Sequence, residues 1–531
     1  MEFAWMVATA VAAAAASWAL NAVVVHLVWR PRAIARRLRA QGVTGPDYRF
    51  YSGNLPDIRR LHEESASLVL DVASHDFIPV VQPYFHKYIP LYGRGCTPRA
   101  SRICRSRGCL ARVVWRSSKA RVGSATHKVI QPAFNMDKLK MMTKAMFDCA
   151  GSMVSEWESK LVAGGGGTVE IELSRQFEEL TADVISHTAF GSSYVEGKQV
   201  FVAQRELLFL ALSTFFTVQF PGDTTRSSRY GNDLLGLMLE SCAAPEHGGA
   251  ALALSMDEII DECKTFFFAG QDTTSHILTW TMFLLSTHPE WQEKLGEEVA
   301  AECGDQVPTG DMLTKLKLVN MFLLETLRLY SPVPLIESRA VSDLELGSGG
   351  VRVPEGTILK IPIATIHRDK DVWGDDADEF RPERFENGVS RAANHPNALL
   401  SFSSGPRACI GQNFAMMEAK VIIAMILQRF SFALSPNYVH APTDVITLRP
   451  KYGLPMILKS LKLYDVYINK SLSFFIEIKG GNEKNVKISN NVLITYMMYL
   501  NMVIHLPPMM LCAAFCVVDG NLPDLISDTV S

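Results

Sequence analysis

The sequence predicts a mainly helical protein with a minor β portion, behind an N-terminal membrane anchor. Three observations support this prediction. Residues 3–29 are apolar and Ala-rich, residues 255–286 and 289–303 carry helix start and stop signals, and short β-like runs at 351–354 and 357–363 are bounded by Gly and Pro. With 531 residues, of which 48% are apolar, the chain has material for several domains or for one large helical domain.

The first segment, residues 1–29, is typical of a transmembrane signal anchor. Its apolar run contains the polar residues Ser17, Asn21 and His26, and about 20 such residues are enough to cross a bilayer. Arginines follow at once in residues 30–39 and none precedes, so the positive-inside rule places the body of the protein in the cytosol. A cleaved signal peptide is the alternative, but it would have a basic start and a shorter apolar stretch.

Charge and cysteine usage exclude two classes of protein. A net charge of −3 and an isoelectric point near 6.5 argue against a nucleic-acid binder. The 10 cysteines show no framework of paired spacings, which fits a reduced, cytosol-facing fold better than a disulfide scaffold.

Residues 30–46 are expected to form a basic linker and hinge. After them, start and stop signals in the sequence predict the helices. Ser255 and Glu258 form a capping box at the start of a long helix. Pro289 ends that helix and opens the next one. A further helix over residues 313–330 is expected to stop before Pro332.

The most informative stretch runs Phe402-Ser-Ser-Gly-Pro-Arg-Ala-Cys409-Ile-Gly411, and an apolar helix is expected after it, over residues 412–430. This setting suits a thiolate ligand of haem iron, which needs a deprotonated cysteine shielded from water. Gly405 and Gly411 allow the backbone to approach a flat macrocycle, and the helix start directs its positive dipole end toward the sulfur. Arg407 can neutralise a haem propionate.

This decade resembles the haem-binding signature of cytochromes P450, F-x-x-G-x-R-x-C-x-G. The resemblance implies the P450 fold, haem b (iron protoporphyrin IX) as cofactor and Cys409 as the axial ligand of the iron. It also implies these haem-binding residues: Arg339, Phe402, Gly405, Arg407 and Gly411. The competing interpretation is a buried cysteine in a strand-to-helix turn.

A second motif, Ala269-Gly-Gln-Asp-Thr-Thr274, lies midway along the long helix. Gly270 inside an apolar helix costs about 1 kcal/mol relative to Ala, so small residues there leave room for oxygen near the iron. The motif is similar to the P450 oxygen-activation pattern, which implies that Asp272 and Thr273 are catalytic and deliver protons. The alternative is a packing notch made of small residues.

A third set of residues is interpreted as structural. Glu325 and Arg328 are three apart on one helix face. In P450s the arginine that matches Arg384 joins this pair in a buried network near the haem, and buried charges need such pairing.

The resemblance implies a membrane-anchored monooxygenase that hydroxylates or epoxidises an apolar small molecule with O₂ and with NADPH electrons from cytochrome P450 reductase. Its implied location is the endoplasmic reticulum membrane, single-pass, with the catalytic domain facing the cytosol. The sequence segments 131–140, 230–239 and 451–455 resemble plant P450s of the group that includes gibberellin-oxidising enzymes. This resemblance implies a gibberellin-type diterpenoid substrate. The alternatives are a P450-like peroxide isomerase or dehydratase, and a defective, non-catalytic P450 product.

Three regions depart from the family. Within the haem domain, residues 47–463, the stretch 93–127 is Arg- and Cys-rich and lacks the W-x-x-x-R expected before Lys128, and only residues 222–229 stand where the family has two further helices. Residues 464–531 form a tail of different composition, with an apolar run over 493–518. We interpret all three as mis-spliced or read-through coding sequence.

Overall fold

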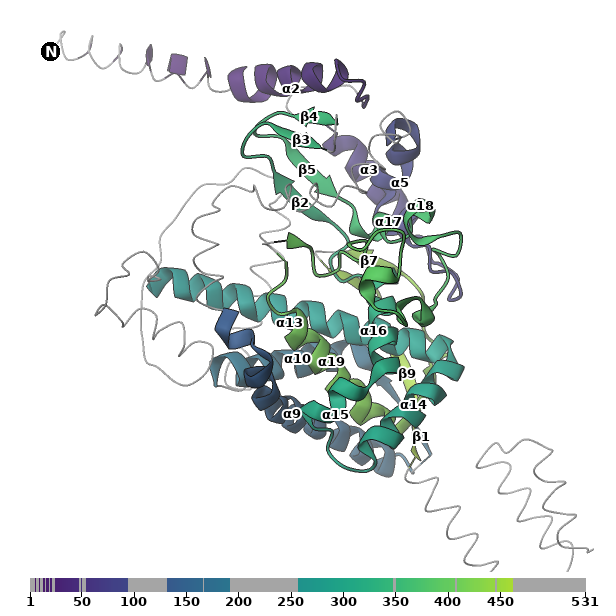
Figure 1. Cartoon of the computed structure of the whole chain (residues 1–531). Coiled ribbons are helices and arrows are strands. Elements are labelled where there is room, and N and C mark those ends of the chain that lie inside the picture. Colours follow the sequence, from purple (N-terminus) through teal and green to yellow (C-terminus); the bar gives the residue numbers. More distant parts are fainter. Residues whose placement is uncertain are drawn as a thin grey trace, which may run out of the picture. The chain divides into compact units, whose positions relative to one another are not determined.

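The structure is a computed structural model that describes residues 24–46, 54–93, 131–165, 167–191, 256–346, 350–405, 408–444 and 447–461, with position 49 and scattered positions between 5 and 21 (Figure 1). The segments 222–229 and 464–531, and nearly all of 93–127, lie outside these residues. Their interpretation as aberrant coding sequence stays a prediction.

Helices dominate the described chain. In chain order they are η1 (Val25–Trp29), α2 (Arg30–Arg39), α3 (Leu55–Ser65), α4 (Ile78–Val81), α5 (Pro83–Tyr88), η2 (Ile89–Gly93), η3 (Gln131–Phe134), α9 (Met136–Ala163), α10 (Leu173–Phe190), α13 (Met256–Thr287), α14 (Pro289–Cys303), α15 (Gly310–Lys315), α16 (Lys317–Leu329), α17 (Ile363–Ile366), α18 (Lys370–Trp373), η4 (Pro382–Phe385), η5 (Val389–Arg391) and α19 (Gln412–Leu427).

The β portion is small, as predicted. Its strands are β1 (Thr168–Glu172), β2 (Ile336–Arg339), β3 (Leu344–Leu346), β4 (Val351–Val353), β5 (Ile358–Ile361), β6 (Phe430–Leu434), β7 (Pro442–Asp444), β8 (Leu448–Pro450) and β9 (Pro455–Ser460). One sheet has the order β1-β9-β6, and the pairs β2-β5, β3-β4 and β7-β8 are antiparallel. In the β2-β5 pair, Ile336 lies opposite Ile361 and Arg339 opposite Ile358.

The chain divides into two units. The larger unit contains Met1–Ser155, Glu170–Gln428 and Phe432–Ile457, and the smaller one contains Glu156–Val169, Arg429–Ser431 and Leu458–Ser531. Within the smaller unit, Trp157 packs on Phe430 with ring centroids 5.8 Å apart. All residues of the candidate site belong to the larger unit.

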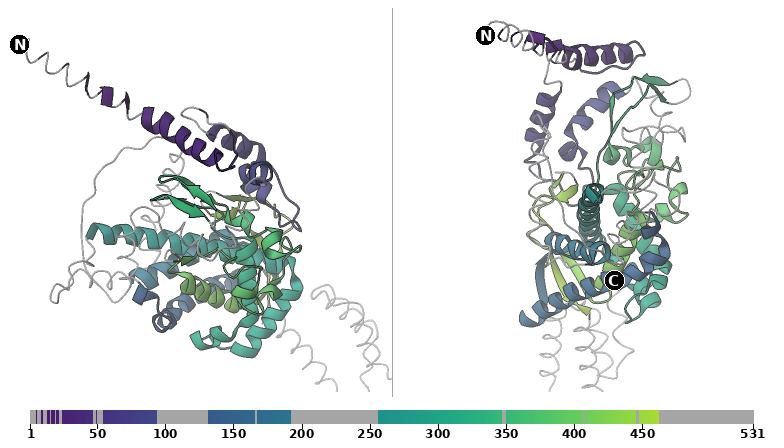
Figure 2. Two further views of the ribbon diagram at one scale, coloured as in Figure 1. Left: turned by 45° about the horizontal axis from the view of Figure 1, so that its top comes forward. Right: turned by 90° about the vertical axis from the view of Figure 1, so that its left-hand side faces the viewer.

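Helix α13 is the centre of the larger unit, and α10, α14, α16 and α19 pack against it (Figures 1 and 2). Its second half is buried almost completely, with Leu278, Trp280, Phe283 and Leu284 at 0% exposure. Burial of each such side chain stabilises the fold by about 1.5–3 kcal/mol. The bounds of α13 confirm the helix predicted over 255–286 within one residue at each end, and those of α14 confirm the helix predicted over 289–303.

Two predicted boundaries are wrong. The helix expected over 313–330 is two helices, because Leu316 between them has a ψ of 84°. Helix α16 restarts there since the Glu298 carboxylate accepts the backbone N–H groups of Leu318 and Val319 at 2.8 and 2.9 Å. Helix α19 ends at Leu427 rather than 430, because Phe430 begins β6.

The N-terminal region has helical backbone at the described positions, and α2 continues it. Its end contacts β4, where the Gln41 side chain forms two hydrogen bonds to the Arg352 backbone at 2.6 and 2.9 Å. No helix among the described residues is both long and apolar enough to span a bilayer. The anchor at residues 1–29 stays a prediction.

Candidate active site

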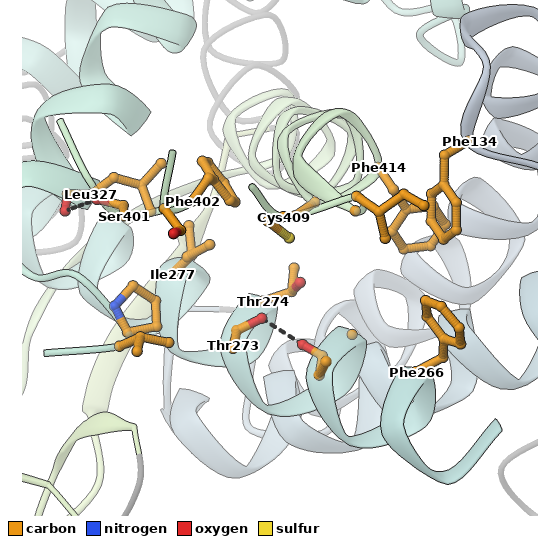
Figure 3. Close-up of a pocket in the computed structure, with 18 of the residues that line it drawn as sticks. Phe134, Phe266, Thr273, Thr274, Ile277, Leu327, Ser401, Phe402, Cys409 and Phe414 are labelled. Atoms are coloured by element: carbon orange, nitrogen blue, oxygen red, sulfur yellow. Dashed lines mark hydrogen bonds between the residues drawn. The ribbon is translucent and has the colours of Figure 1, made fainter. Parts of the chain in front are cut away.

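A cavity of about 300 Å³ lies between α13 and the loop that carries Cys409 (Figure 3). Its described lining is apolar except for the thiol of Cys409 and four hydroxyls, which belong to Thr273, Thr274, Ser401 and Ser403. The lining therefore contains no charged side chain, and it suits a large, flat, mostly apolar group.

The loop before Cys409 is folded tightly by its own backbone. The Cys409 N–H donates to the Phe402 carbonyl at 2.8 Å, and the Ala408 N–H donates to the Gly405 carbonyl at 2.9 Å. Ser403 and Gly405 take the left-handed conformation, with φ of 60° and 79°. Gly405 accepts this conformation without strain, whereas Ser403 is a non-glycine residue held in it.

Two opposing effects act on the pKa of the Cys409 thiol. Burial raises the pKa of its thiol, whereas a hydrogen bond from the Gly411 backbone N–H lowers that pKa. A cation opposite the sulfur would remove the cost of burying the thiolate.

These residues fit the haem that the sequence predicts. Cys409 is the only thiol that lines the cavity, and no imidazole lines it among the described residues. Ala269 and Gly270 of α13, which have almost no side chain, line the same cavity, so a macrocycle can lie between helix and loop.

Gly270 has two functions at once. A Cβ built there would lie 2.9 Å from Cδ1 of Ile185 in α10, so the glycine permits close packing of α10 on α13. The same residue lines the cavity. The packing notch that the sequence offered as an alternative is therefore present at this turn, and the oxygen-binding space beside it stays a prediction.

The hydroxyl of Thr273 lies in the cavity and donates to the Ala269 carbonyl at 2.6 Å (Figure 3). Thr274 also lines the cavity, and its buried hydroxyl has no hydrogen-bond partner among the described residues. The sequence analysis assigned no role to Thr274, although it stands next to Thr273 in the same motif and lines the same cavity.

Asp272, by contrast, does not line the cavity. Its Oδ2 accepts a hydrogen bond of 2.6 Å from the hydroxyl of Thr447, just before β8. His276, one turn along α13, donates from Nδ1 to the Asp272 carbonyl at 2.6 Å. The predicted acid and alcohol are thus neighbours in sequence whose side chains have different surroundings.

An aromatic wall closes one side of the cavity. The ring of Phe134 lies 6.0 Å from that of Phe266 and 6.4 Å from that of Phe414. The stretch 131–140, which resembles plant P450s, includes Phe134 but assigned it no role in a site, because the three rings come from η3, α13 and α19 and meet only in the fold.

The structure also brings together Glu325, Arg328 and Arg384. Arg328 forms a bidentate pair with Glu325 at 2.7 and 2.8 Å, and Nε of Arg384 lies 3.7 Å from the same carboxylate. Beside them, burial lowers the pKa of His367 to about 3. Its neutral ring donates from Nδ1 to the Arg328 carbonyl and accepts at Nε2 from the Leu400 N–H, both at 2.9 Å.

The structure places the predicted haem-binding residues in different positions relative to the cavity. Phe402 and Gly411 line the cavity, and Gly405 shapes the loop. Arg339 is exposed on β2 and does not line the cavity, although Ile336 of the same strand does. Arg407 lies outside the described residues.

Elsewhere, Cys149, Asp183 and His187 offer ligand atoms within 4.8 Å of one another on α9 and α10. Burial, followed by the charge of Asp183, raises the pKa of the Cys149 thiol far above its usual range. The thiol therefore keeps its proton in this structure and hydrogen-bonds with Asp183.

Comparisons with known proteins agree with this geometry. The family model for Cytochrome P450 matches residues 222–454. The chain is 42% identical over 500 residues to Cytochrome P450 709B1 of Arabidopsis thaliana, covering 82% of this chain and 95% of that protein. It is 36% identical over 504 residues to Cytochrome P450 734A1 of Arabidopsis thaliana (82% and 93% covered) and 35% identical over 523 residues to Secologanin synthase 1 of Catharanthus roseus (86% and 98%).

The aligned length exceeds the number of residues that this chain contributes. The first alignment runs over 500 residues although it covers only 82% of a 531-residue chain, so the relative has stretches without a counterpart here.

Proposed function

Because this chain belongs to the cytochrome P450 family and is a monooxygenase of that family, we propose that it hydroxylates or epoxidises an apolar small molecule in the cavity between α13 and the Cys409 loop. One observation carries the proposal. The Cys409 thiol and the hydroxyls of Thr273 and Thr274 line the same apolar cavity, which contains no charged side chain among its described lining.

Cys409 would hold haem through its sulfur, with the Gly411 N–H donating to that sulfur. Phe402 and Gly411 would contact the macrocycle, while Arg339 and Arg407 are proposed as partners of its propionates. Haem, when bound, supplies the activation of O₂ that no amino-acid side chain can perform. The protein excludes water, orients the substrate and controls protons.

Proton supply falls to Asp272 and Thr273. The Thr273 hydroxyl lies in the cavity and can pass a proton inward. Asp272 has a side chain that is 22% exposed, so it can exchange protons with solvent. This pair argues against the alternative reading, a peroxide isomerase or dehydratase, which needs no external protons or reductase.

The substrate is proposed to be apolar and of terpenoid size. The aromatic wall of Phe134, Phe266 and Phe414 offers apolar contacts without hydrogen-bonding groups. Because this wall has no polar groups, it would favour a polycyclic hydrocarbon skeleton. A gibberellin-type diterpenoid is the specific proposal. A screen for substrate-induced shifts of the Soret band tests it. A response to another chemical class, with none to diterpenoids, would overturn this part.

Partners and location follow from the same proposal. Electrons would come from NADPH through cytochrome P450 reductase, and residues 1–29 would anchor the protein in the endoplasmic reticulum membrane with the haem domain, residues 47–463, in the cytosol. The apolar run of residues 3–29 and the arginines after it support this orientation.

A second candidate is a non-catalytic product that holds haem poorly. The stretches that a relative has and this chain lacks favour it, together with the unusual text at 93–127 and the tail at 464–531. The tail's apolar run would promote aggregation if exposed.

The reduced carbon monoxide difference spectrum decides between the two candidates. We expect a thiolate-type band from the full chain that is lost in Cys409→Ser. No band from the full chain, and a band only after a typical family segment replaces residues 93–127, would support the second candidate. A thiolate-type band retained in Cys409→Ser would refute the assignment of the ligand.

A further inference from the structure

The Asp272 carboxylate is held by a residue far away in sequence. Thr447 donates its hydroxyl to Oδ2 of Asp272 at 2.6 Å, and Thr447 itself is only 4% exposed. Hydrogen bonds to a charged acceptor are stronger than neutral ones, particularly when they are short and shielded.

The position of Thr447 is fixed by its neighbour. The Leu448 carbonyl accepts from the indole N–H of Trp280 at 2.9 Å, and the Leu448 N–H donates to the Pro332 carbonyl at 2.8 Å. Trp280 lies on α13 eight residues after Asp272, and both Trp280 and Leu448 have 0% exposure. The start of β8 is therefore bound to α13 through Trp280 and to the segment after α16 through Pro332, so the Thr447 hydroxyl is held in place before any reaction.

The nearby histidine does not take this role. The Nδ1–H of His276 is used by the Asp272 carbonyl at 2.6 Å, and the same nitrogen lies 3.9 Å from Oδ2. Thr447 thus makes the closer contact with the carboxylate.

The contact holds the carboxylate on the side of α13 that does not line the cavity. Thr273 lines the cavity and Asp272 does not, as expected for adjacent helix residues that are about 100° apart around the axis. Transfer of a proton from Asp272 to Thr273 therefore requires the carboxyl group to turn from Thr447 toward Thr273.

We propose that Thr447 is a positioning residue for proton supply, which holds the Asp272 carboxylate at the solvent side of α13 and sets its turn toward Thr273. The inference rests on the proposed function. Water gives a proton to the carboxylate, the carboxyl group passes it to Oγ1 of Thr273, and that hydroxyl gives its own proton into the cavity. Only O–H bonds form and break, and no electron moves.

The test compares Thr447→Val, which removes the donor, with Thr447→Ser, which keeps it. Thr443→Val is the matched control, because Thr443 lies on the paired strand β7 opposite Arg449. We expect product formed per NADPH to fall about tenfold in Thr447→Val, the order of one hydrogen bond to a charged group, with a larger solvent isotope effect. Substrate affinity should not change, and Thr447→Ser and Thr443→Val should resemble the parent.

A readout without turnover examines the contact itself. The infrared difference between the parent and Asp272→Asn isolates the carboxylate band of Asp272. We expect that band to shift in Thr447→Val and to keep its position in Thr447→Ser. An unshifted band in Thr447→Val would overturn the proposal.

The double variant Asp272→Asn/Thr447→Val gives the second decision. If Thr447 acts through Asp272, its replacement has no further effect once the carboxylate is gone. An equal loss of coupling in both backgrounds would overturn the proposal, because Thr447 would then act elsewhere. A parent without a thiolate band or NADPH-dependent oxidation would instead refute the proposed function, while the infrared comparison would still judge the contact.

Discussion

Arg328 binds Glu325 with all five of its N–H groups occupied. Two donate to the carboxylate, at 2.7 and 2.8 Å, and three donate to the carbonyls of His367, Ala377 and Glu379. Both side chains have 0% exposure. The pair therefore joins α16 to the segment over residues 367–379. Its contribution to stability depends on every charged and polar group being paired.

Replacement of Glu325 by Ala should lower the free energy of unfolding by about 3–5 kcal/mol, because it leaves the Arg328 charge buried without its partner. Urea denaturation measures the loss. The matched control is Glu337→Ala, which removes an exposed pair with Lys360 at 3.7 Å and should cost less than about 1 kcal/mol. Equal losses in the two variants would show that the buried pair has no special structural role.

Gly270→Ala should destabilise the protein or narrow the cavity, although alanine is the better helix former. Its Cβ would lie 2.9 Å from Cδ1 of Ile185 and 3.2 Å from Cγ1. The control is Gly296→Ala in α14, where nothing lies within 4 Å of the new Cβ, and which should stabilise the helix by about 0.5–1 kcal/mol. Thermal unfolding measures both variants.

A second change distinguishes strain from other causes. Ile185→Val shortens the opposing side chain, so it should restore part of the stability lost in Gly270→Ala. If Gly270→Ala is as stabilising as Gly296→Ala, then α10 can move away and the glycine is not needed for packing.

Stability should fall as the pH drops from about 6.5 toward 3. Burial lowers the pKa of His367 to about 3, whereas the pKa of an unfolded histidine is about 6.5. Between these values the unfolded chain binds a proton that the folded ring does not, so protonation favours unfolding. Above pH 6.5 this contribution is constant. The His75 and His440 rings, with pKa values lowered by burial to about 3 and 4, act in the same direction.

His367→Gln should make the pH dependence shallower by up to about 1.4 kcal/mol per pH unit within that window, whatever its effect at pH 7. The free energy of unfolding, measured at several pH values, gives the slope. His86→Gln is the control, since that side chain is exposed on α5. Identical slopes in the parent and in His367→Gln would contradict the prediction.

The sequence was most informative where function and local structure coincide. The Cys409 loop and the long helix with Asp272 and Thr273 were found from motifs, because glycines, a lone cysteine and helix caps are local signals. Thr447 and Phe134 could not be found in this way, since they approach the site only through tertiary packing. The break at Leu316 was missed for the same reason, because the group that caps α16 is Glu298 on another helix.

Thr273→Ala should release more peroxide per NADPH, whereas Thr273→Ser should stay close to the parent. The Thr273 hydroxyl faces the cavity and donates to the Ala269 carbonyl at 2.6 Å, and it follows directly after Asp272. Its loss would interrupt the transfer of protons inward, and we expect coupling to fall about 100-fold, the lower end of the usual contribution of a positioned proton donor.

Thr274→Ala is the sharpest comparison, because both hydroxyls line one cavity and only that of Thr274 lacks a partner among the described residues. If the carboxyl group of Asp272 supplies Thr273, then Thr274→Ala should change substrate affinity more than coupling. Product, peroxide and NADPH measured in parallel separate these effects. If Thr274→Ala uncouples the reaction and Thr273→Ala does not, the proton passes through the second threonine. The order of residues in the motif would then have misidentified the donor, because an unpartnered hydroxyl is freer to turn toward the reacting atoms than one already bound to the Ala269 carbonyl.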